Sequence, residues 1–289
     1  MASSPEPLAQ TDDGSDGSCQ PSADCLQRRR PPLAWDAASR PDLALPADVL
    51  PTKVCAAHTF GHRLAALVAE ALGLAAEADP AVTLSKLHLR PEGQRFQAQA
   101  GGTHHIPKAG RHDAFGKRFT QKCQDAEFRA RLDATLREFV RDAVLPAVDG
   151  PAHGWDALVY QATPSLRIHM PHTRPSIGLH RDFDYYHQPT EINVWVPLVP
   201  LASGTNSLYC ESAPGRGDFR PFEARLGELV RFYGNQHAHF AMVNESQVTR
   251  VSLDLRVVPA PLFQPAWASP QGDVHFRLGG YYKCTSDVV

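Results

Sequence analysis

The sequence predicts an α+β fold in which helices near the N-terminus brace an antiparallel β-sandwich or barrel. Two early segments carry apolar residues at helical spacing, and from about residue 156 short alternating segments recur between Pro, Gly and Asn turns. The chain has 289 residues, of which 43% are hydrophobic, which is enough to build a core. Its 29 basic and 31 acidic residues argue against a nucleic-acid partner. No apolar run reaches the roughly 18 residues of a membrane span.

The composition changes near residue 34. Residues 1–34 are rich in Ser, Asp, Gly, Pro and Gln, with too little apolar surface to offset the entropy lost on ordering, so we expect a disordered tail. We expect residues 35–289 to form a single domain. The N-terminus lacks the basic start and apolar core of a secretory signal. The six cysteines include no C-x-x-C pair, so we expect reduced thiols and a cytoplasmic protein.

Periodicity assigns the elements of the first half. Apolar residues at helical spacing predict helices over 59–78 and 125–145, each with one apolar stripe. The patch between Val82 and Leu89 has a strand-like pattern. Residues 98–118 are rich in Gly, His and Lys and are expected to form a long loop.

The segment SIGLHRDFDYY, residues 176–186, carries the first candidate metal ligands. In a strand, alternate side chains share a face, so His180 and Asp182 would project together. An imidazole and a carboxylate so placed can bind one divalent metal side by side. Asp184 would lie on the same face and is a rival carboxylate.

A third ligand is available about sixty residues further along the chain. Both His237 and His239 follow an apolar strand within residues 229–244. Two histidines and one carboxylate form the facial triad that holds non-haem Fe(II) in oxygenases. This triad leaves metal positions open, as a co-substrate and an oxidant require. Spacing alone leaves the choice between the two histidines open.

The segment TRVSLDLRVV, residues 249–258, alternates without a break. Its apolar face consists of Val251, Leu253, Leu255 and Val257. Its polar face consists of Arg250, Ser252, Asp254 and Arg256. A solvent-facing edge strand would explain this pattern. Alternatively, the polar face points into the barrel, where one arginine receives a carboxylate through its two-pronged donor geometry.

These motifs, in this order over about residues 160–260, resemble the Fe(II)/2-oxoglutarate-dependent dioxygenases. The stretches HRDFDYYHQPTEINVWVPL, GTNSLYCESAPGRGDF, GNQHAHFAMVN and TRVSLDLRVVP are similar to the phytanoyl-CoA-hydroxylase-like branch, and within it to the StrG-like group of streptomycin biosynthesis. The resemblance does not extend to the N-terminal part. It implies a double-stranded β-helix, a relative of the jelly roll, braced by the N-terminal helices.

Carried over position by position, the resemblance implies that His180, Asp182 and His239 bind the metal. His239 is preferred because Asn-Gln-x-x-His, followed five residues later by Asn, matches the group; His237 remains the alternative. Halogenases of the family replace the carboxylate with a small residue, so the presence of Asp182 disfavours that activity.

The resemblance also implies a co-substrate site. Arg250 and Ser252 form the Arg-x-Ser pattern that holds the distal carboxylate of 2-oxoglutarate in the family. Arg256 lies on the same strand face and is the second choice. Asn193 lies on the EINVWVPL segment, which lines the pocket in the family, and is expected to contact the co-substrate.

Three further residues are candidates for substrate contacts. Trp195 shares a strand face with the pocket, although a core position explains it equally well. Tyr185 follows the metal motif, and exposed aromatic packing is its alternative explanation. Arg167 is a candidate for binding an acidic substrate group, although a structural ion pair is the preferred explanation.

Together these observations predict an oxygenase that uses Fe(II), 2-oxoglutarate and O2 to hydroxylate, or otherwise oxidise, a small-molecule metabolite. The group to which the chain is similar suggests secondary-metabolite, amino-sugar or amino-acid biosynthesis. Two alternatives are a cupin-type metal enzyme, such as an isomerase, that does not need Arg250, and a non-catalytic binding module on the same fold.

Overall fold

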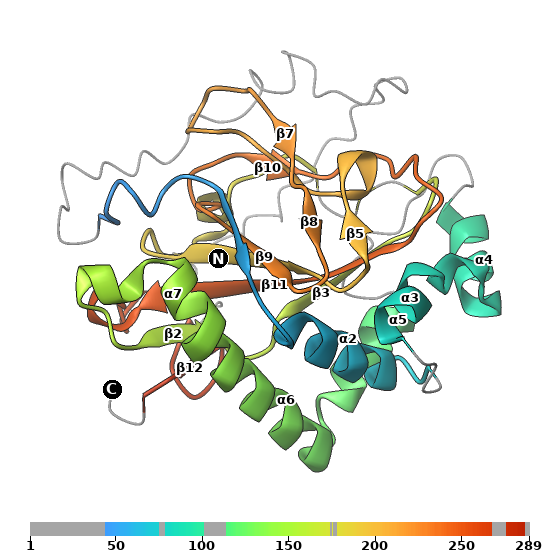
Figure 1. Cartoon of the computed structure of the whole chain (residues 1–289), viewed down its shortest axis with the longest axis horizontal. Coiled ribbons are helices and arrows are strands. Elements are labelled where there is room, and N and C mark those ends of the chain that lie inside the picture. The colour runs from blue at the N-terminus through green and yellow to red at the C-terminus, as the bar shows by residue number, and fades with distance from the viewer. Residues whose placement is uncertain are drawn as a thin grey trace, which may run out of the picture.

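The computed structural model describes residues 44–74, 79–100, 114–173, 175, 178–267 and 276–286. The tail predicted at 1–34 lies outside these residues. The described chain combines helices with antiparallel sheets, which confirms the α+β class. Figure 1 shows the helices α2, α6 and α7 on one side of the large sheet and the strands of two small sheets on the other.

The two predicted helices are present. Helix α2 spans Phe60–Ala71 and buries its apolar stripe. Helix α6 spans Ala126–Phe139. Asp125 caps its N-terminus, because the Asp125 carboxylate accepts a hydrogen bond from the Phe128 amide at 2.8 Å. The helix continues through a π-helical turn, Val140–Val144, into α7, Leu145–Ala147. The rings of Phe60 and Phe139 meet with centroids 5.6 Å apart, which joins the two helices.

The strand predicted at 82–89 is wrong. This segment forms the helix α3, Pro80–Ser85, and a 3-10 turn, Leu87–Leu89. The Asp79 carboxylate accepts hydrogen bonds from the amides of residues 81 and 82, and Pro80 occupies the first turn, where its missing N–H costs nothing. This local cap outweighs the strand-like spacing of a short apolar run.

The expected loop at 98–118 is helical at both ends. Helix α4 spans Pro91–Ala100 and helix α5 spans Ala114–Lys122, while 101–113 lie outside the described residues. Helix α5 forms because Phe115 and Phe119, four residues apart, are both buried on one face.

Twelve strands are described, and all of their pairings are antiparallel. The large sheet has the order β1-β9-β4-β11-β2-β12, with β3 also paired to β11. Its strands are β1 (Lys53–Ala56), β2 (Leu158–Gln161), β3 (Ser165–His169), β4 (Ile192–Pro197), β9 (Glu228–Phe232), β11 (Arg250–Pro259) and β12 (Tyr282–Cys284). The small sheets are β10-β6-β7 (His239–Phe240, Tyr209–Cys210, Arg220–Pro221) and β5-β8 (Leu201–Ala202, Ala224–Arg225). The double-stranded β-helix stays a prediction.

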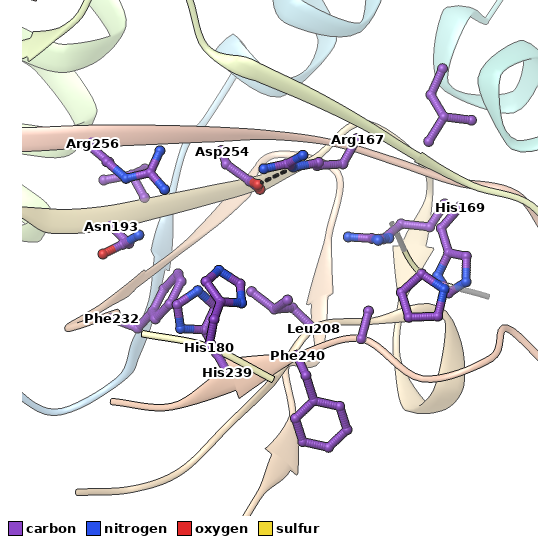
Figure 2. A pocket seen from close by; sticks show the side chains of 15 residues that line it. Arg167, His169, His180, Asn193, Leu208, Phe232, His239, Phe240, Asp254 and Arg256 are labelled. Carbon is purple, nitrogen blue, oxygen red and sulfur yellow. Dashed lines mark hydrogen bonds and ion pairs between the residues drawn. The ribbon is translucent and has the colours of Figure 1, made fainter. Parts of the chain in front are cut away.

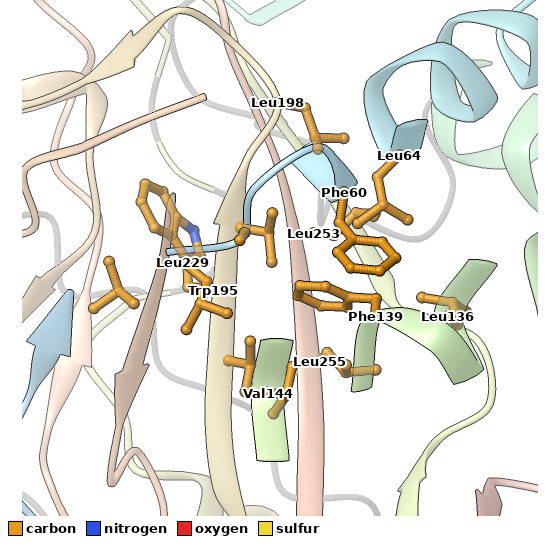
Figure 3. Close-up of a cluster of buried hydrophobic side chains, with 14 of the residues drawn as sticks. Phe60, Leu64, Leu136, Phe139, Val144, Trp195, Leu198, Leu229, Leu253 and Leu255 are labelled. Atoms are coloured by element: carbon orange, nitrogen blue, oxygen red, sulfur yellow. The ribbon is translucent and has the colours of Figure 1, made fainter. Parts of the chain in front are cut away.

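Strand β11 separates the core from the pocket described below. It pairs with β4 on one side and with β2 and β3 on the other, so the edge-strand interpretation is wrong. Its apolar side chains are buried, and Figure 3 shows Leu253 and Leu255 beside residues of α2 and α6. The helices therefore cover the apolar face of this strand and leave its polar face to the opposite side of the sheet.

Two further expectations concern membranes and disulfides. Over the described ranges, no helix combines the length and the apolar character needed to cross a bilayer. The four cysteines in these ranges, Cys55, Cys123, Cys210 and Cys284, are free thiols.

The contact between α2, α6 and the sheet predicts a large stability loss on truncation of Phe139. This side chain is 1% exposed, so Phe139→Ala removes a ring and leaves a cavity, which costs about 3–5 kcal/mol. Urea unfolding of the full chain should show this decrease. Leu89 is 61% exposed, so Leu89→Ala is the control and should change the free energy of unfolding by less than about 0.5 kcal/mol. Equal effects would contradict the assigned core.

Candidate metal centre

His180 and Asp182 do not lie on one continuous strand, which corrects the expectation for residues 176–186. His180 forms an isolated bridge with His239, in which each amide donates to the other residue's carbonyl, at 3.1 and 2.9 Å. A 3-10 turn follows at Asp182–Tyr185. The chain leaves the extended conformation because the amide of Asp182 donates to the carbonyl of Gly234 and the carboxylate of Asp184 caps the amide of Arg181.

The backbone nevertheless brings His180, Asp182 and His239 together. Their ligand atoms lie within 4.8 Å of one another. Oδ1 of Asp182 is 3.7 Å from Nε2 of His180 and 3.8 Å from Nε2 of His239. The alternatives lie outside this group: His237 is not part of it, and Asp184 forms an ion pair with Arg181 at 2.8 Å.

Both imidazoles are oriented by backbone carbonyls. Nδ1 of His180 is 2.8 Å from the carbonyl oxygen of Gly178, and Nδ1 of His239 is 3.0 Å from that of His237. A carbonyl only accepts, so each Nδ1 carries the proton and each Nε2 presents a lone pair to the centre of the group. Burial, reinforced by His239, lowers the pKa of His180 to about 3, so this ring is neutral at pH 7.

The two carboxylate oxygens of Asp182 have different surroundings. Oδ2 accepts hydrogen bonds from Asn193 Nδ2 at 2.6 Å and from Arg256 Nε at 2.8 Å. Oδ1 is buried and has no hydrogen-bond partner among the described residues. Burial alone raises the pKa of Asp182, but Arg256, together with His187 and His239, holds the pKa well below its usual range. A buried, ionised oxygen without a donor is costly, and a cation facing the two Nε2 atoms would satisfy it.

Strand register explains why the two donors converge on Asp182. Asn193 on β4 lies directly opposite Arg256 on β11. Gly234 gives the Asn193 side chain its room, because a Cβ at this position would lie 2.8 Å from the Asn193 amide and 2.7 Å from the Phe232 ring. The same glycine receives the backbone hydrogen bond from Asp182, at 2.9 Å.

We call His180, Asp182 and His239 the metal-ligand group. A pocket with an empty volume of about 680 Å³, part of it open to solvent, extends from this group along the polar face of β11. Figure 2 shows His180, His239, Asn193 and Arg256 toward one end and His169 toward the other. Arg250 also lines it. Thus His180, His239, Asn193, Arg250, Arg256 and Arg167, all singled out from the sequence, line one space.

Arg250 is buried, and Asp254 attracts its guanidinium without forming an ion pair with it. Its Nη1 donates to Ser252 Oγ at 3.2 Å, its guanidinium lies 6.0 Å from the centre of the Trp195 ring, and its Nε has no described hydrogen-bond partner. Among the described residues it forms no ion pair. Burial lowers the pKa of Arg250 to about 10, which still leaves it charged at pH 7. A carboxylate entering the pocket would meet a desolvated guanidinium with unused donors.

The three expected substrate residues have different positions. Arg167 forms an ion pair with Asp254, at 2.9 Å, and both residues line the pocket. Tyr185 is 50% exposed and presents its ring edge-on to His180, with centroids 5.6 Å apart. Trp195 is buried in the core, packs against Phe222 and does not line the pocket.

Several lining residues carry no sequence motif. Leu208, Phe232 and Phe240 form part of the pocket wall, and Phe232 contacts the His239 ring with centroids 5.3 Å apart. Their segments read as ordinary apolar strands, and only the fold shows that these side chains face the pocket.

Comparison with known proteins identifies one relative by sequence. No family model matches the chain. The streptomycin biosynthesis protein StrG from Streptomyces griseus is 35% identical over 128 residues, which are 44% of this chain and 60% of that protein. The chain is therefore homologous to StrG over this part, as the resemblance predicted, and spans 60% of the length of that relative.

Solved structures with lower similarity were also found. The non-haem, alpha-ketoglutarate-dependent epimerase SnoN from nogalamycin biosynthesis matches with a TM-score of 0.43 and 15% identity, over 87% of this chain and 100% of that chain. The nickel complex of the non-haem monooxygenase ThoJ matches with a TM-score of 0.36 and 15% identity, over 78% of this chain and 77% of that chain. At TM-scores below 0.5, these likenesses establish neither fold nor activity.

The close approach at Gly234 predicts that Gly234→Ala displaces Asn193. The added methyl group has no room beside the Asn193 amide and the Phe232 ring, so we expect a loss of about 1–3 kcal/mol in the free energy of unfolding. Gly178→Ala is the control, because no described residue comes within 4 Å of a Cβ at that position. A neutral Gly234→Ala would show that the packing around Asn193 is looser than described.

Proposed function

We propose that the chain is an iron(II)- and 2-oxoglutarate-dependent oxygenase that oxidises a small-molecule metabolite with O2. The observation that carries this proposal is the group of His180, Asp182 and His239, in which the partnerless Oδ1 of Asp182 faces two imidazole Nε2 atoms. Two imidazoles and one carboxylate are the donor set of the facial triad used by non-haem iron oxygenases. The sequence motifs shared with the StrG-like group point to the same chemistry.

In this proposal His180, Asp182 and His239 would hold the iron beside the pocket that His180 and His239 line. When bound, the iron together with 2-oxoglutarate and O2 supplies the oxidation of a substrate C–H bond, while 2-oxoglutarate is converted to succinate and carbon dioxide. The chain contributes the fixed orientation of its ligands: the two backbone carbonyls keep each Nδ1 protonated and each Nε2 free.

The co-substrate site follows from the distribution of charge in the pocket. Among the described residues, Arg250 is the pocket arginine without an ion pair. Its guanidinium donates a hydrogen bond to the Ser252 hydroxyl. We assign these two residues to the distal carboxylate of 2-oxoglutarate. Arg256 and Asn193, the other co-substrate candidates, contact Asp182 instead.

Hydroxylation of a biosynthetic small molecule is the outcome we propose. The StrG relative is named for streptomycin biosynthesis, which supports a biosynthetic substrate. The exposed Tyr185 and the pocket residue Arg167 are the proposed substrate contacts. Trp195 would act through Arg250, under which its ring lies. We further propose that residues 35–289 form one domain and that its two-sided sheet arrangement is a double-stranded β-helix.

The metal ligands are tested by a pair of histidine variants. His239→Ala removes an Nε2 atom from the group and should abolish stoichiometric Fe(II) or Co(II) binding, measured by anaerobic titration calorimetry. His237→Ala is the matched control, since His237 contributes only its carbonyl to the site, and should retain binding. The reverse pattern would mean that His237 is the third ligand.

The cofactor is tested without knowledge of the substrate. Anaerobic addition of 2-oxoglutarate to the ferrous protein should produce a visible charge-transfer band, and exposure to O2 should release succinate. Absence of both with iron bound would favour the cupin-type enzyme that does not use 2-oxoglutarate. Absence of iron binding would favour the non-catalytic binding module.

Arg250→Ala separates the co-substrate role from the metal role. Loss of the guanidinium removes the charged donors for the distal carboxylate, so the 2-oxoglutarate concentration at half-saturation of the charge-transfer band should rise at least about tenfold, which corresponds to roughly 1.4 kcal/mol. Metal affinity should change little. A collapse of metal binding would contradict the assigned role.

A further inference from the structure

We infer that Arg256 and Asn193 are positioning residues for the metal ligand Asp182 and do not contact the co-substrate. This inference rests on the proposed metal site and adds a role that the sequence motifs do not assign. Its basis is the division of the Asp182 carboxylate into one oxygen occupied by protein donors and one oxygen without a partner.

The occupied oxygen has no room for another partner. Each carboxylate oxygen has about two lone-pair sites, and Oδ2 of Asp182 uses them for Asn193 Nδ2 at 2.6 Å and Arg256 Nε at 2.8 Å. Only Oδ1 remains for a metal. The two donors therefore make Asp182 a ligand through a single oxygen and keep Oδ2 from turning toward the metal.

The Arg256 guanidinium already contacts three side chains of the protein. Its Nε lies between two carboxylates, 2.8 Å from Asp182 and 3.7 Å from Glu191, and its Nη1 is 3.5 Å from the Gln161 side-chain oxygen. Its side chain is 11% exposed. A co-substrate carboxylate would have to compete with these acids, whereas Arg250 forms no ion pair in the described part of the chain.

Glu191 is the second carboxylate beside Arg256, and it has contacts of its own with three residues. It is fully buried and accepts hydrogen bonds from the Tyr282 hydroxyl at 2.5 Å and the Gln188 amide at 3.2 Å, and its other oxygen lies 2.8 Å from His187 Nδ1. Tyr282 belongs to β12, so the C-terminal strand reaches the metal ligand through Glu191 and Arg256. These buried contacts restrict the rotation of Glu191 and Arg256.

Cobalt titration of the full-length chain, in the absence of 2-oxoglutarate, tests the inference. Arg256→Gln should weaken Co(II) binding about 10–100-fold, the range found when partners of metal ligands are removed. It should also shift the visible absorption of bound Co(II), because the freed Oδ2 changes the coordination. Affinity of the cobalt-loaded protein for 2-oxoglutarate should stay within about twofold. Asn193→Ala removes the other donor, and the same changes are expected in a smaller degree.

Arg250→Gln is the matched control, since it makes the same substitution on the same strand and in the same pocket. It should leave Co(II) affinity and absorption unchanged and weaken 2-oxoglutarate binding. Circular dichroism and thermal unfolding check that each variant is folded. If Arg256→Gln does not fold, Asn193→Ala and the charge-preserving Arg256→Lys provide the same readouts.

The outcomes separate the inference from the proposed function. Unchanged Co(II) affinity and absorption in folded Arg256→Gln and Asn193→Ala would overturn the inference alone. Loss of 2-oxoglutarate binding in Arg256→Gln with intact Co(II) binding would also overturn it and make Arg256 a co-substrate residue. Failure of the unaltered chain to bind Co(II) would overturn the proposed function and the inference together.

Discussion

The arrangement of the candidate site depends on the Asp182 carboxylate, because one of its oxygens accepts hydrogen bonds from the protein and the other faces the two histidines. Asp182 accepts hydrogen bonds from Asn193 and Arg256 through Oδ2, and its Oδ1 faces the Nε2 atoms of two imidazoles. A buried carboxylate in this position would be protonated or displaced without a cation nearby, because desolvation penalises its charge. Arg256 on β11 is the largest of the positive charges that keep the pKa of Asp182 low.

The apolar face of β11 fixes the chemistry on its polar face. Leu253 and Leu255 are buried against the helical layer, and a slip of one residue would turn them toward the pocket and the arginines into the core. The same register places Arg256 opposite Asn193 on β4 and Arg250 opposite His169 on β3. Core packing therefore determines the distance between the metal-ligand end and the Arg250 end of the pocket.

The sequence predicts the parts of this fold whose signals are local or strongly periodic. The apolar stripes of α2 and α6 and the alternation of β11 are of this kind. The strand expected at 82–89 is wrong because Asp79 and Pro80 start a helix there. His180 and His239 could be chosen from motifs, but their pairing across an isolated bridge depends on distant backbone segments. The contact of Arg256 with Asp182 was not predictable, because it follows from register and from a 3-10 turn.

Ion pairing distinguishes the pocket arginines that have a structural role from the one that is available to bind a ligand. Burying a charge is costly unless an opposite charge or hydrogen bonds compensate it. Arg256 forms an ion pair with Asp182 and Arg167 forms one with Asp254, so each of these two arginines has an opposite charge within the chain. Arg250 is more deeply buried and forms no ion pair among the described residues; it contacts the Ser252 hydroxyl and the Trp195 ring, and Asp254 attracts it without an ion pair. Among the described pocket residues, Arg250 is therefore the arginine without an ion pair, and it lies at the opposite end of the β11 polar face from the candidate metal ligands. An anionic ligand that reaches both ends would stabilise the folded chain as it binds.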